Sequence, residues 1–411
     1  MAETANKSTF KLLIYSHFFA PSIGGVETIV LSLARGLAEL CDVTGARQFE
    51  VTLVTQTPAG NFDDEALPFR VVRHPGFLSL WRLIRDADRA LLAGPAVLPL
   101  FFSLLRGKSP VVTHHGYQAV CPNGMLFQFS PQINCPGHFA ARRYAECVRC
   151  NAPEKGWTAS LRLLLLTFIR RSLARQAAAN VGVSEHVANR IALPHSQVIR
   201  NAAPDLADPT RTTIPASSNQ QEIRFAYVGR LVTEKGVKIL LDAAGLLAKQ
   251  GLTPPILIIG DGPERSALER QKFFLKLGEN VAFLGVQRGA ALEEHTKHIS
   301  VLVMPSVCQD VAPLSVLEMM MKGRLIICSR IGGLAEQVGQ AGLTFAPGDA
   351  DELAQQMRAV LDDPTLATSL GKSARERAVS EYTLQRMIGE YSALLASRNT
   401  KNIPILILDT Y

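Results

Sequence analysis

The sequence has few charged and aromatic residues, and no apolar run long enough to cross a membrane. Charged residues make up 19% of its 411 residues and aromatic residues 7%, with two Trp. The longest apolar stretch, residues 90–105, is interrupted by glycine and proline and falls short of the about 20 residues that a span needs. The N-terminus lacks the pattern of a signal peptide. We therefore expect a cytoplasmic protein.

Cysteine is also sparse, and its seven copies are an odd number, which argues against a disulfide framework. Four of them, Cys121, Cys135, Cys147 and Cys150, fall within 30 residues. The Cys147-x2-Cys150 spacing is half of a structural zinc site, but the other pair is too widely spaced for a standard ribbon. A structural zinc site, a redox-active or disulfide pair, and free thiols in a packed lid remain as alternatives.

What is present is an ordinary globular composition, which excludes collagen, coiled coil and extended disorder. The length suits two domains. Charge is divided unevenly: residues 1–203 carry 21 Lys and Arg against 13 Asp and Glu, whereas residues 204–411 carry 22 against 23. A basic first half indicates an anionic partner, either a membrane surface or an acidic ligand.

The chain repeats a strand, loop and helix pattern on both sides of a stretch rich in proline and polar residues. Continuous apolar strands that alternate with helices indicate parallel sheets covered on both faces. The predicted strands are residues 10–16, 49–55, 69–73, 110–113, 178–183 and 198–200, and then 223–228, 255–259, 281–284, 301–304, 325–328 and 342–345. We expect two doubly wound α/β domains with a cleft between them.

In each half, the loop after the first strand is a candidate ligand-binding loop. Gly24 and Gly25 lie between the first strand and the first helix, where glycines let backbone amides approach an anion. In the second half, Arg230 and Lys235 flank the loop at the carboxyl end of the strand, where ligands bind in a doubly wound sheet. Two cations there suit a diphosphate. A tight turn and a solvated loop are the plainer alternatives.

A third motif spans residues 304–318 and holds Asp310 and Glu318, eight residues apart around Pro313. Because proline suits the first turn of a helix, Asp310 should lie just before a helix and Glu318 about one turn inside it. Free amides at the start of that helix would meet phosphate oxygens. The alternative is that Asp310 caps the helix and Glu318 is an exposed helical residue.

Taken in order, these motifs resemble the retaining glycosyltransferases of family four, which have the GT-B architecture of two Rossmann-like domains. The resemblance runs from about residue 10 to 395. It rests on the ordered set Gly24-Gly25-Val26-Glu27, Gly229-Arg230, Lys235-Gly236, Gly260-Asp261-Gly262-Pro263-Glu264, Phe283-Leu284-Gly285, Pro305-Ser306, Glu318, Gly332-Gly333 and Pro347-Gly348-Asp349.

The resemblance implies a domain plan. An acceptor domain would cover residues 1–203, with a cysteine-containing insertion at about 121–155. A linker would cover 204–221, and a nucleotide-sugar donor domain 222–382. Residues 383–411 would form a helix that crosses back to the first domain, followed by an apolar tail.

The same resemblance implies site roles. Arg230 and Lys235 would bind the donor diphosphate, Glu318 its ribose and Asp310 the donor sugar. Aspartate is a departure here, because the family usually has glutamate. The remaining donor-binding residues would be Gly24, Gly25, Gly229, Gly260, Asp261, Leu284, Ala312, Pro313, Leu314 and Ser315.

A histidine at the donor sugar is also implied, after the strand that ends near residue 113. The neighbouring Tyr117 and Cys121-Pro122 favour His115, with His114 as the alternative.

The implied reaction transfers a sugar from a UDP- or GDP-sugar to a hydroxyl of a glycan or lipid-linked acceptor, with retention of configuration and no catalytic metal. Cell-surface polysaccharide or glycolipid synthesis would be the setting. Another GT-B activity, such as a nucleotide-sugar epimerase or a disaccharide-phosphate synthase, and a non-catalytic nucleotide-sugar-binding scaffold are the alternatives.

A last feature is the apolar and basic segment 155–175, which starts near Trp157. Such a helix suits a membrane interface, and a buried helix with a basic outer face is the alternative. The basic balance of the first half favours peripheral contact with an anionic membrane, on the inner face of the plasma membrane. Nucleic acid is not expected as a partner, because no binding motif for it occurs.

Overall fold

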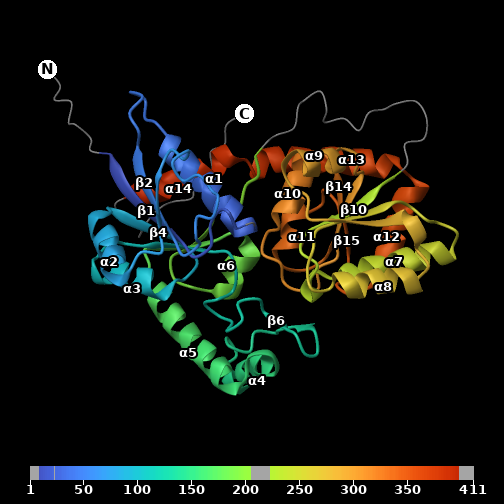
Figure 1. Cartoon of the computed structure of the whole chain (residues 1–411), viewed down its shortest axis with the longest axis horizontal. Helices are drawn as coiled ribbons and strands as arrows, with labels where there is room; N and C mark the ends of the chain where they lie inside the picture. The colour runs from blue at the N-terminus through green and yellow to red at the C-terminus, as the bar shows by residue number, and fades with distance from the viewer. Residues whose placement is uncertain (1–8, 23, 205–222, 398–411) are drawn as a thin grey trace. The chain divides into compact units, whose positions relative to one another are not determined.

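A computed structural model describes residues 9–22, 24–204 and 223–397, which form two compact units (Figure 1). Unit 1 contains the described residues up to 124 together with 137–201 and 384–397. Unit 2 contains residues 125–136, 202–204 and 223–383. The predicted linker and the apolar tail lie outside the described residues, apart from residue 204.

Unit 1 is built on a seven-stranded parallel sheet in the order β3-β2-β1-β4-β5-β8-β9. Its inner strands are mostly apolar and buried, as expected for a sheet with helices on both faces, whereas the edge strands β3 and β9 are polar and partly exposed. The strands are β1 (Phe10–Ser16), β2 (Phe49–Thr55), β3 (Arg70–Arg73), β4 (Arg89–Ala93), β5 (Val111–His114), β8 (Ala179–Gly182) and β9 (Ser196–Val198). The helices are α1 (Gly25–Glu39), α2 (Phe77–Asp86), α3 (Val97–Leu105), α4 (Tyr144–Lys155), α5 (Trp157–Ala174), α6 (Glu185–Ile191) and α14 (Leu384–Ala396).

Helix α14, the last described helix, packs within unit 1. It lies against α1, where Gly36 leaves room for Ile388. The guanidinium of Arg89 donates to the carbonyls of Leu394 and Leu395 at 3.0 and 2.8 Å, and thereby satisfies backbone groups at the end of α14.

Unit 2 has a six-stranded parallel sheet in the order β12-β11-β10-β13-β14-β15. One large apolar cluster fills the space between this sheet and its helices. The strands are β10 (Phe225–Val228), β11 (Ile256–Ile259), β12 (Val281–Gly285), β13 (Val301–Met304), β14 (Leu325–Ser329) and β15 (Leu343–Phe345). The helices are η1 (Thr233–Lys235), α7 (Val237–Lys249), α8 (Arg265–Phe274), η2 (Gly278–Asn280), α9 (Gly289–Lys297), α10 (Leu314–Met321), α11 (Gly332–Val338), α12 (Ala350–Asp362) and α13 (Thr365–Glu381).

A short antiparallel hairpin, β6 (Phe127–Gln128) and β7 (Ile133–Asn134), also belongs to unit 2. The chain before and after it belongs to unit 1. The sequence analysis placed the whole insertion 121–155 in the first domain, and the hairpin departs from that plan. Asn134 of the hairpin and the next residue, Cys135, form hydrogen bonds with the loop after β13 in the same unit. Hydrophobic periodicity cannot reveal such contacts.

The prediction of two doubly wound α/β domains is confirmed, whereas the cleft between them stays a prediction. The apolar run 90–105 divides into β4 and α3, because Gly94 and Pro95 break it. Among the described helices, none combines the length and apolar character needed to cross a bilayer.

Candidate functional site

The candidate site lies in unit 2, where the strand order reverses at the centre of the sheet. Strands β10 and β13 are neighbours, yet the chain winds outward from them in opposite directions. The loops that follow them, 229–236 and 305–313, therefore leave the same edge of the sheet side by side. Ligands of doubly wound sheets bind at this topological switch point.

Lys235 and Asp310 meet here, one from each loop. The Nζ of Lys235 lies 2.6 Å from Oδ1 of Asp310, and their side chains are only 16% and 12% exposed. The hydroxyl of Ser306 donates to the other carboxylate oxygen, Oδ2, at 2.5 Å. Both oxygens of Asp310 are thus held by donors, which fixes the direction of the carboxylate.

The protonation of Lys235 is decided by two opposing effects. Burial, the largest single effect, lowers the pKa of its ammonium, but Asp310 and Cys308 together outweigh burial and the nearby Arg230, and the pKa is raised above its ordinary value. Lys235 is therefore a cation at neutral pH. An ammonium has three donors, so the contact with Asp310 leaves others for a ligand.

The backbone between the two loops is closely packed. Gly236 adopts φ +65°, and a Cβ at this position would lie 2.0 Å from the carbonyl oxygen of Pro305. The left-handed backbone and the lack of space for a Cβ therefore both require glycine at this position. The amide of Val307 donates to the carbonyl of Glu234 at 3.0 Å, and this bond joins the loop of Asp310 to the turn of Lys235.

Helix α10 begins at Leu314 with Pro313 as its N-cap residue, and no side chain caps it. The capping alternative for Asp310 is therefore wrong, since its carboxylate binds Lys235 and Ser306 instead. The first amides of the helix, at Leu314 and Ser315, have no partner within the helix and form an anion-binding end. The carbonyl of Pro313 accepts from Nε2 of Gln337 at 3.1 Å, which steadies this end.

Glu318 lies on α10 as expected, in a half-buried position. Burial raises the pKa of its carboxyl; Lys322 lowers it and Glu293 raises it. The proposed ribose contact stays a prediction.

Arg230 is exposed at the start of its loop, so its guanidinium faces solvent. Its backbone is fixed by Tyr227, a fully buried side chain whose hydroxyl donates to the carbonyl of Arg230 at 2.7 Å. The sequence analysis assigned no role to Tyr227 or Ser306. Their places, just before the end of β10 and just after β13, are the signals that could have found them.

The other donor-binding residues expected in unit 2 lie at the same carboxyl edge of the sheet as Lys235 and Asp310. A Cβ at Gly260 would lie 1.8 Å from the carbonyl oxygen of Gly229, so these two loops touch through backbone alone. Asp261 accepts from the amide of Gly262 at 2.7 Å and pairs with Arg265. Leu284 is half-buried, on β12. Ala312 is half-buried, in the loop before α10.

In unit 1, Gly24 is the N-cap residue of α1, and Gly25 begins the helix. Residue 23 lies outside the described residues. Gly24 has extended backbone, and a side chain here would displace the carboxylate at the flexible end of Glu27. Their placement at a helix start agrees with the sequence pattern, while their role toward a ligand stays a prediction.

The two histidines occupy different environments at the end of β5. His114 is wholly buried, and its Nε2 lies 2.9 Å from Oδ1 of Asn180. The amide nitrogen of Asn180 donates to two carbonyls, so its oxygen must accept, and Nε2 of His114 carries the proton. Burial lowers the pKa of His114 to about 4.

His115, beyond the strand, is half-buried. Burial and the neighbouring His114 lower its pKa to about 4 as well, so both rings are neutral at pH 7. His114 is fully enclosed and bonded to Asn180, which leaves His115 as the better candidate to meet a substrate. That role stays a prediction.

Of the four clustered cysteines, Cys121, Cys135 and Cys147 are buried and Cys150 is half-buried. The Sγ of Cys121 lies 2.9 Å from Oδ1 of Asn123, whose Nδ2 lies 3.9 Å from Sγ of Cys150. Cys135 is in unit 2, and the other three are in unit 1. Within the described part of the chain, no three His, Cys, Asp or Glu side chains group closely enough to hold a metal.

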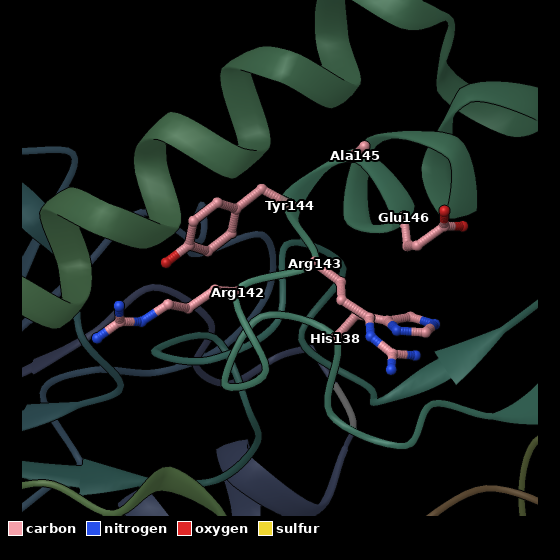
Figure 2. A pocket seen from close by; sticks show the side chains of 6 residues that line it. All are labelled: His138, Arg142, Arg143, Tyr144, Ala145 and Glu146. Carbon is pink, nitrogen blue, oxygen red and sulfur yellow. The ribbon is translucent and has the colours of Figure 1, made fainter.

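A shallow hollow of about 760 Å³ lies at the start of α4 in unit 1. Figure 2 shows Arg142 pointing to one side of it, beside Tyr144, and Arg143 pointing to the other, beside His138. Because the two guanidinium groups diverge, they do not form one binding site for a single anion. The hollow adds positive charge to this face of unit 1.

Helix α5 has a buried face and an apolar exposed face. Ser160, Leu164, Thr167 and Ala174 are buried, whereas Leu161 and Leu165 are 51% and 54% exposed. Helix α3 packs on both α2 and α5, and these helices expose further large apolar side chains. The set that we call the apolar face comprises Phe77, Leu78, Leu98, Phe101, Leu105, Trp157, Leu161, Leu165, Phe168 and Ile169.

Comparison with known proteins agrees with this architecture. Residues 211–377 match the family model described as "Glycosyl transferases group 1". The 2-deoxystreptamine glucosyltransferase of Streptomyces kanamyceticus is 30% identical over 240 residues, which are 55% of this chain and 62% of that protein. The chain therefore spans less than two thirds of this relative's length.

Solved structures share the fold at low identity. HepE of Anabaena, solved with UDP and glucose, aligns with a TM-score of 0.67 at 17% identity, over 94% of this chain and all of that one. WaaG, a glycosyltransferase of lipopolysaccharide biosynthesis, aligns with a TM-score of 0.65 at 15% identity, over 94% of this chain and all of that one. These likenesses establish the two-domain GT-B fold.

Proposed function

We propose that this chain, whose residues 211–377 match the family model of the group 1 glycosyl transferases, moves a sugar from a nucleotide diphosphate sugar to a hydroxyl of a glycan or lipid-linked acceptor. The observation that carries the proposal is the meeting of Lys235 and Asp310 at the switch point of unit 2, near the free amides of α10 and the exposed Arg230. UDP in the similarly folded HepE supports a UDP-sugar donor, and a GDP-sugar is the alternative.

The charges of this site suit a diphosphate leaving group. Arg230 and Lys235 supply positive charge where negative charge develops as the sugar leaves, and the amides at Leu314 and Ser315 add aligned dipoles. These groups supply the charge that a catalytic metal would otherwise bring. Asp310 would hold a sugar hydroxyl, and Glu318 the ribose.

The reaction would retain the configuration of the transferred sugar. The acceptor hydroxyl would attack from the face that the diphosphate leaves, and the leaving phosphate would help to take its proton. Both oxygens of Asp310 are held by donors, which suits a fixed hydrogen-bonding role better than proton transfer. His115, neutral at pH 7, would bind the donor sugar.

The acceptor side of the proposal includes peripheral contact with an anionic membrane. The apolar face gives the interface its hydrophobic part, and Arg162, Arg175 and the hollow with Arg142 and Arg143 add positive charge. An apolar helix face with basic residues near it binds anionic bilayers through both effects. Synthesis of a cell-surface polysaccharide or glycolipid fits such a location.

A thermal-shift panel tests the donor site. The purified chain is heated with UDP, GDP, ADP and their common sugar conjugates, and the unfolding temperature is recorded for each. A nucleotide present at about 100 times its dissociation constant should stabilise the fold by about 2.7 kcal/mol. One nucleotide class should give this shift, and Arg230→Ala should remove most of it.

Arg270→Ala is the matched control, because Arg270 is also exposed in unit 2 but lies on α8. It should bind nucleotide as the wild type does. If both variants lost the same part of the thermal shift, the loss would come from the change in overall charge and not from the donor site. Nucleotide binding without any sugar transfer to a panel of acceptors would favour the non-catalytic scaffold.

A further inference from the structure

The segment 125–136, which contains the hairpin of β6 and β7, is the part of the insertion that belongs to unit 2. It lies between Gly124 and Gly137, which both have positive φ, and its Phe127 is fully buried. Two hydrogen bonds join it to the loop after β13. The Nδ2 of Asn134 donates to the carbonyl of Val307 at 2.7 Å, and Nε2 of Gln309 donates to the carbonyl of Cys135 at 3.5 Å.

The orientation of the Asn134 amide follows from its partner. A carbonyl oxygen only accepts, so the NH₂ group of Asn134 must face Val307. Val307 is held from the other side as well, because its amide donates to the carbonyl of Glu234 beside Lys235. One peptide segment is thus fixed between the hairpin and the turn that carries the lysine.

The consequence reaches Asp310, three residues beyond Val307. Its carboxylate must keep both the contact with Lys235 at 2.6 Å and the contact with Ser306 at 2.5 Å. A shift of the loop 305–310 by a fraction of an ångström would lengthen the contact with Lys235, which lies on the other loop, whereas Ser306 would move together with Asp310. Asn134 and the Glu234–Val307 bond limit that shift from two directions.

We infer that Asn134 is a positioning residue of the donor site, which fixes the loop of Asp310 without touching the donor itself. This inference rests on the proposed function of the site. It assigns to the cysteine-containing insertion an indirect part in donor binding, through the loop of Asp310, in addition to any part on the acceptor side.

The other polar atom of Asn134 allows a clear test. Its Oδ1 is buried and has no hydrogen-bond partner among the described residues. Burying an unsatisfied acceptor costs free energy, which offsets what the Nδ2 bond contributes. A substitution that removes both atoms should therefore change the stability of the unliganded protein little, while it frees the loop.

Calorimetric titration of the full chain with UDP and with UDP-glucose, and with GDP and GDP-mannose as the second pair, measures the effect. Asn134→Ala and Asn134→Leu should weaken binding of the nucleotide-sugar about fivefold, as expected for the loss of one hydrogen bond. Binding of the nucleotide alone should weaken less, because Asp310 is expected to contact the sugar. Leu fills the volume of Asn, so a loss common to both variants does not come from a cavity.

Ile133→Ala is the control, because Ile133 is the neighbouring strand residue and its side chain is exposed. It should bind as the wild type does. If the wild type binds a nucleotide-sugar and the Asn134 variants bind it equally well, the inference is overturned. Equal weakening for nucleotide and nucleotide-sugar, together with a lowered unfolding temperature without ligand, would also overturn it, since that pattern is general destabilisation. If the wild type binds neither pair, the proposed function fails, and the inference fails with it.

Discussion

The two units have the same architecture but opposite chemistry at the carboxyl edges of their sheets. In unit 2 the loops after β10 and β13 bring together a charged pair, Lys235 and Asp310. In unit 1 the corresponding edge at β5 presents His114 and His115, which burial keeps neutral. Under the proposed function, the charged edge would hold the donor diphosphate, and His115 at the neutral edge would meet uncharged sugar hydroxyls.

The outer helices differ in the same way. Most large exposed apolar side chains of the described residues are in unit 1, and many of them lie on α2, α3 and α5. Unit 2 exposes few, notably Phe273 and Phe274 on α8. The comparison teaches that the doubly wound fold sets where a ligand can bind, while the side chains on its loops and helices set which ligand it is.

The largest expected effect separates stability from binding in unit 2. Lys235→Ala removes the cation and leaves the nearly buried Asp310 carboxylate without its ion pair. We expect the free energy of unfolding to fall by about 3 kcal/mol, measured by urea denaturation. Lys235→Met with Asp310→Asn removes both charges, so it should regain most of the stability but bind no nucleotide. Unchanged stability of Lys235→Ala would mean that the pair contributes nothing to the fold.

The next effect should come from the neutral edge of unit 1. The pKa of His114 is about 4 in the folded state, below the ordinary value of about 6.5. The folded state thus binds fewer protons than the unfolded chain between these values, and stability present above pH ~6.5 is lost as pH falls through ~4. The loss should be on the order of 3 kcal/mol.

His114→Gln keeps a donor for Asn180 but cannot titrate. In a series of urea denaturations from pH 7.5 to 4, it should lose less stability than the wild type. Identical pH profiles for both proteins would show that His114 is not the group that makes the fold sensitive to acid.

The apolar face gives a third test, with unit 2 as its control. Leu161→Ser with Leu165→Ser removes two half-exposed side chains, each contributing about 1 kcal/mol if a bilayer covers it. Binding to phosphatidylglycerol vesicles in a flotation assay should weaken about 30-fold. Phe273→Ser with Phe274→Ser removes even more exposed apolar surface but should leave vesicle binding unchanged. If both double variants lost vesicle binding equally, the apolar face of unit 1 would not be a specific membrane-binding surface.

The smallest effect compares two tyrosines in matching places. Tyr15 and Tyr227 each stand one residue before the end of the first strand of their unit. Tyr227→Phe removes the bond to the carbonyl of Arg230 and should lower the free energy of unfolding by about 1 kcal/mol. Tyr15→Phe removes a side-chain hydrogen bond with Gln56 and should cost a similar amount, but only Tyr227→Phe should also weaken nucleotide binding in the thermal-shift assay. Equal nucleotide binding by both variants would contradict a role for Tyr227 in holding Arg230.

Most of the sheet strands could be predicted because buried parallel strands are continuous apolar runs. Residues 10–16, 49–55 and 301–304 were predicted with the bounds that the structure has. Strand β9 was displaced, at Ser196–Val198 instead of 198–200. It lies at the edge of the sheet, where a short and half-buried strand carries little hydrophobic pattern.

The elements of the insertion were missed for a similar reason. The hairpin β6–β7 has two residues in each strand, too few for an alternating pattern to emerge. Helix α4 carries cysteines, arginines and an internal proline, and its apolar residues do not form a stripe. Only contacts with the rest of the chain give these segments their shape.

The amino-acid sequence by itself determined the two doubly wound sheets, the glycines that their loops require, and the positions of the charged residues just after the strands. Those features are local, because they depend on apolar periodicity and on backbone conformations that few residues adopt. Tertiary structure alone decided that Lys235 pairs with Asp310, which lies 75 residues away in the sequence. It also decided that His114 is buried and hydrogen-bonded to Asn180, and that Asn134 donates a hydrogen bond to the carbonyl of Val307. Partners so distant in sequence leave no spacing to read, since only the order of strands in the sheet brings them within hydrogen-bonding distance.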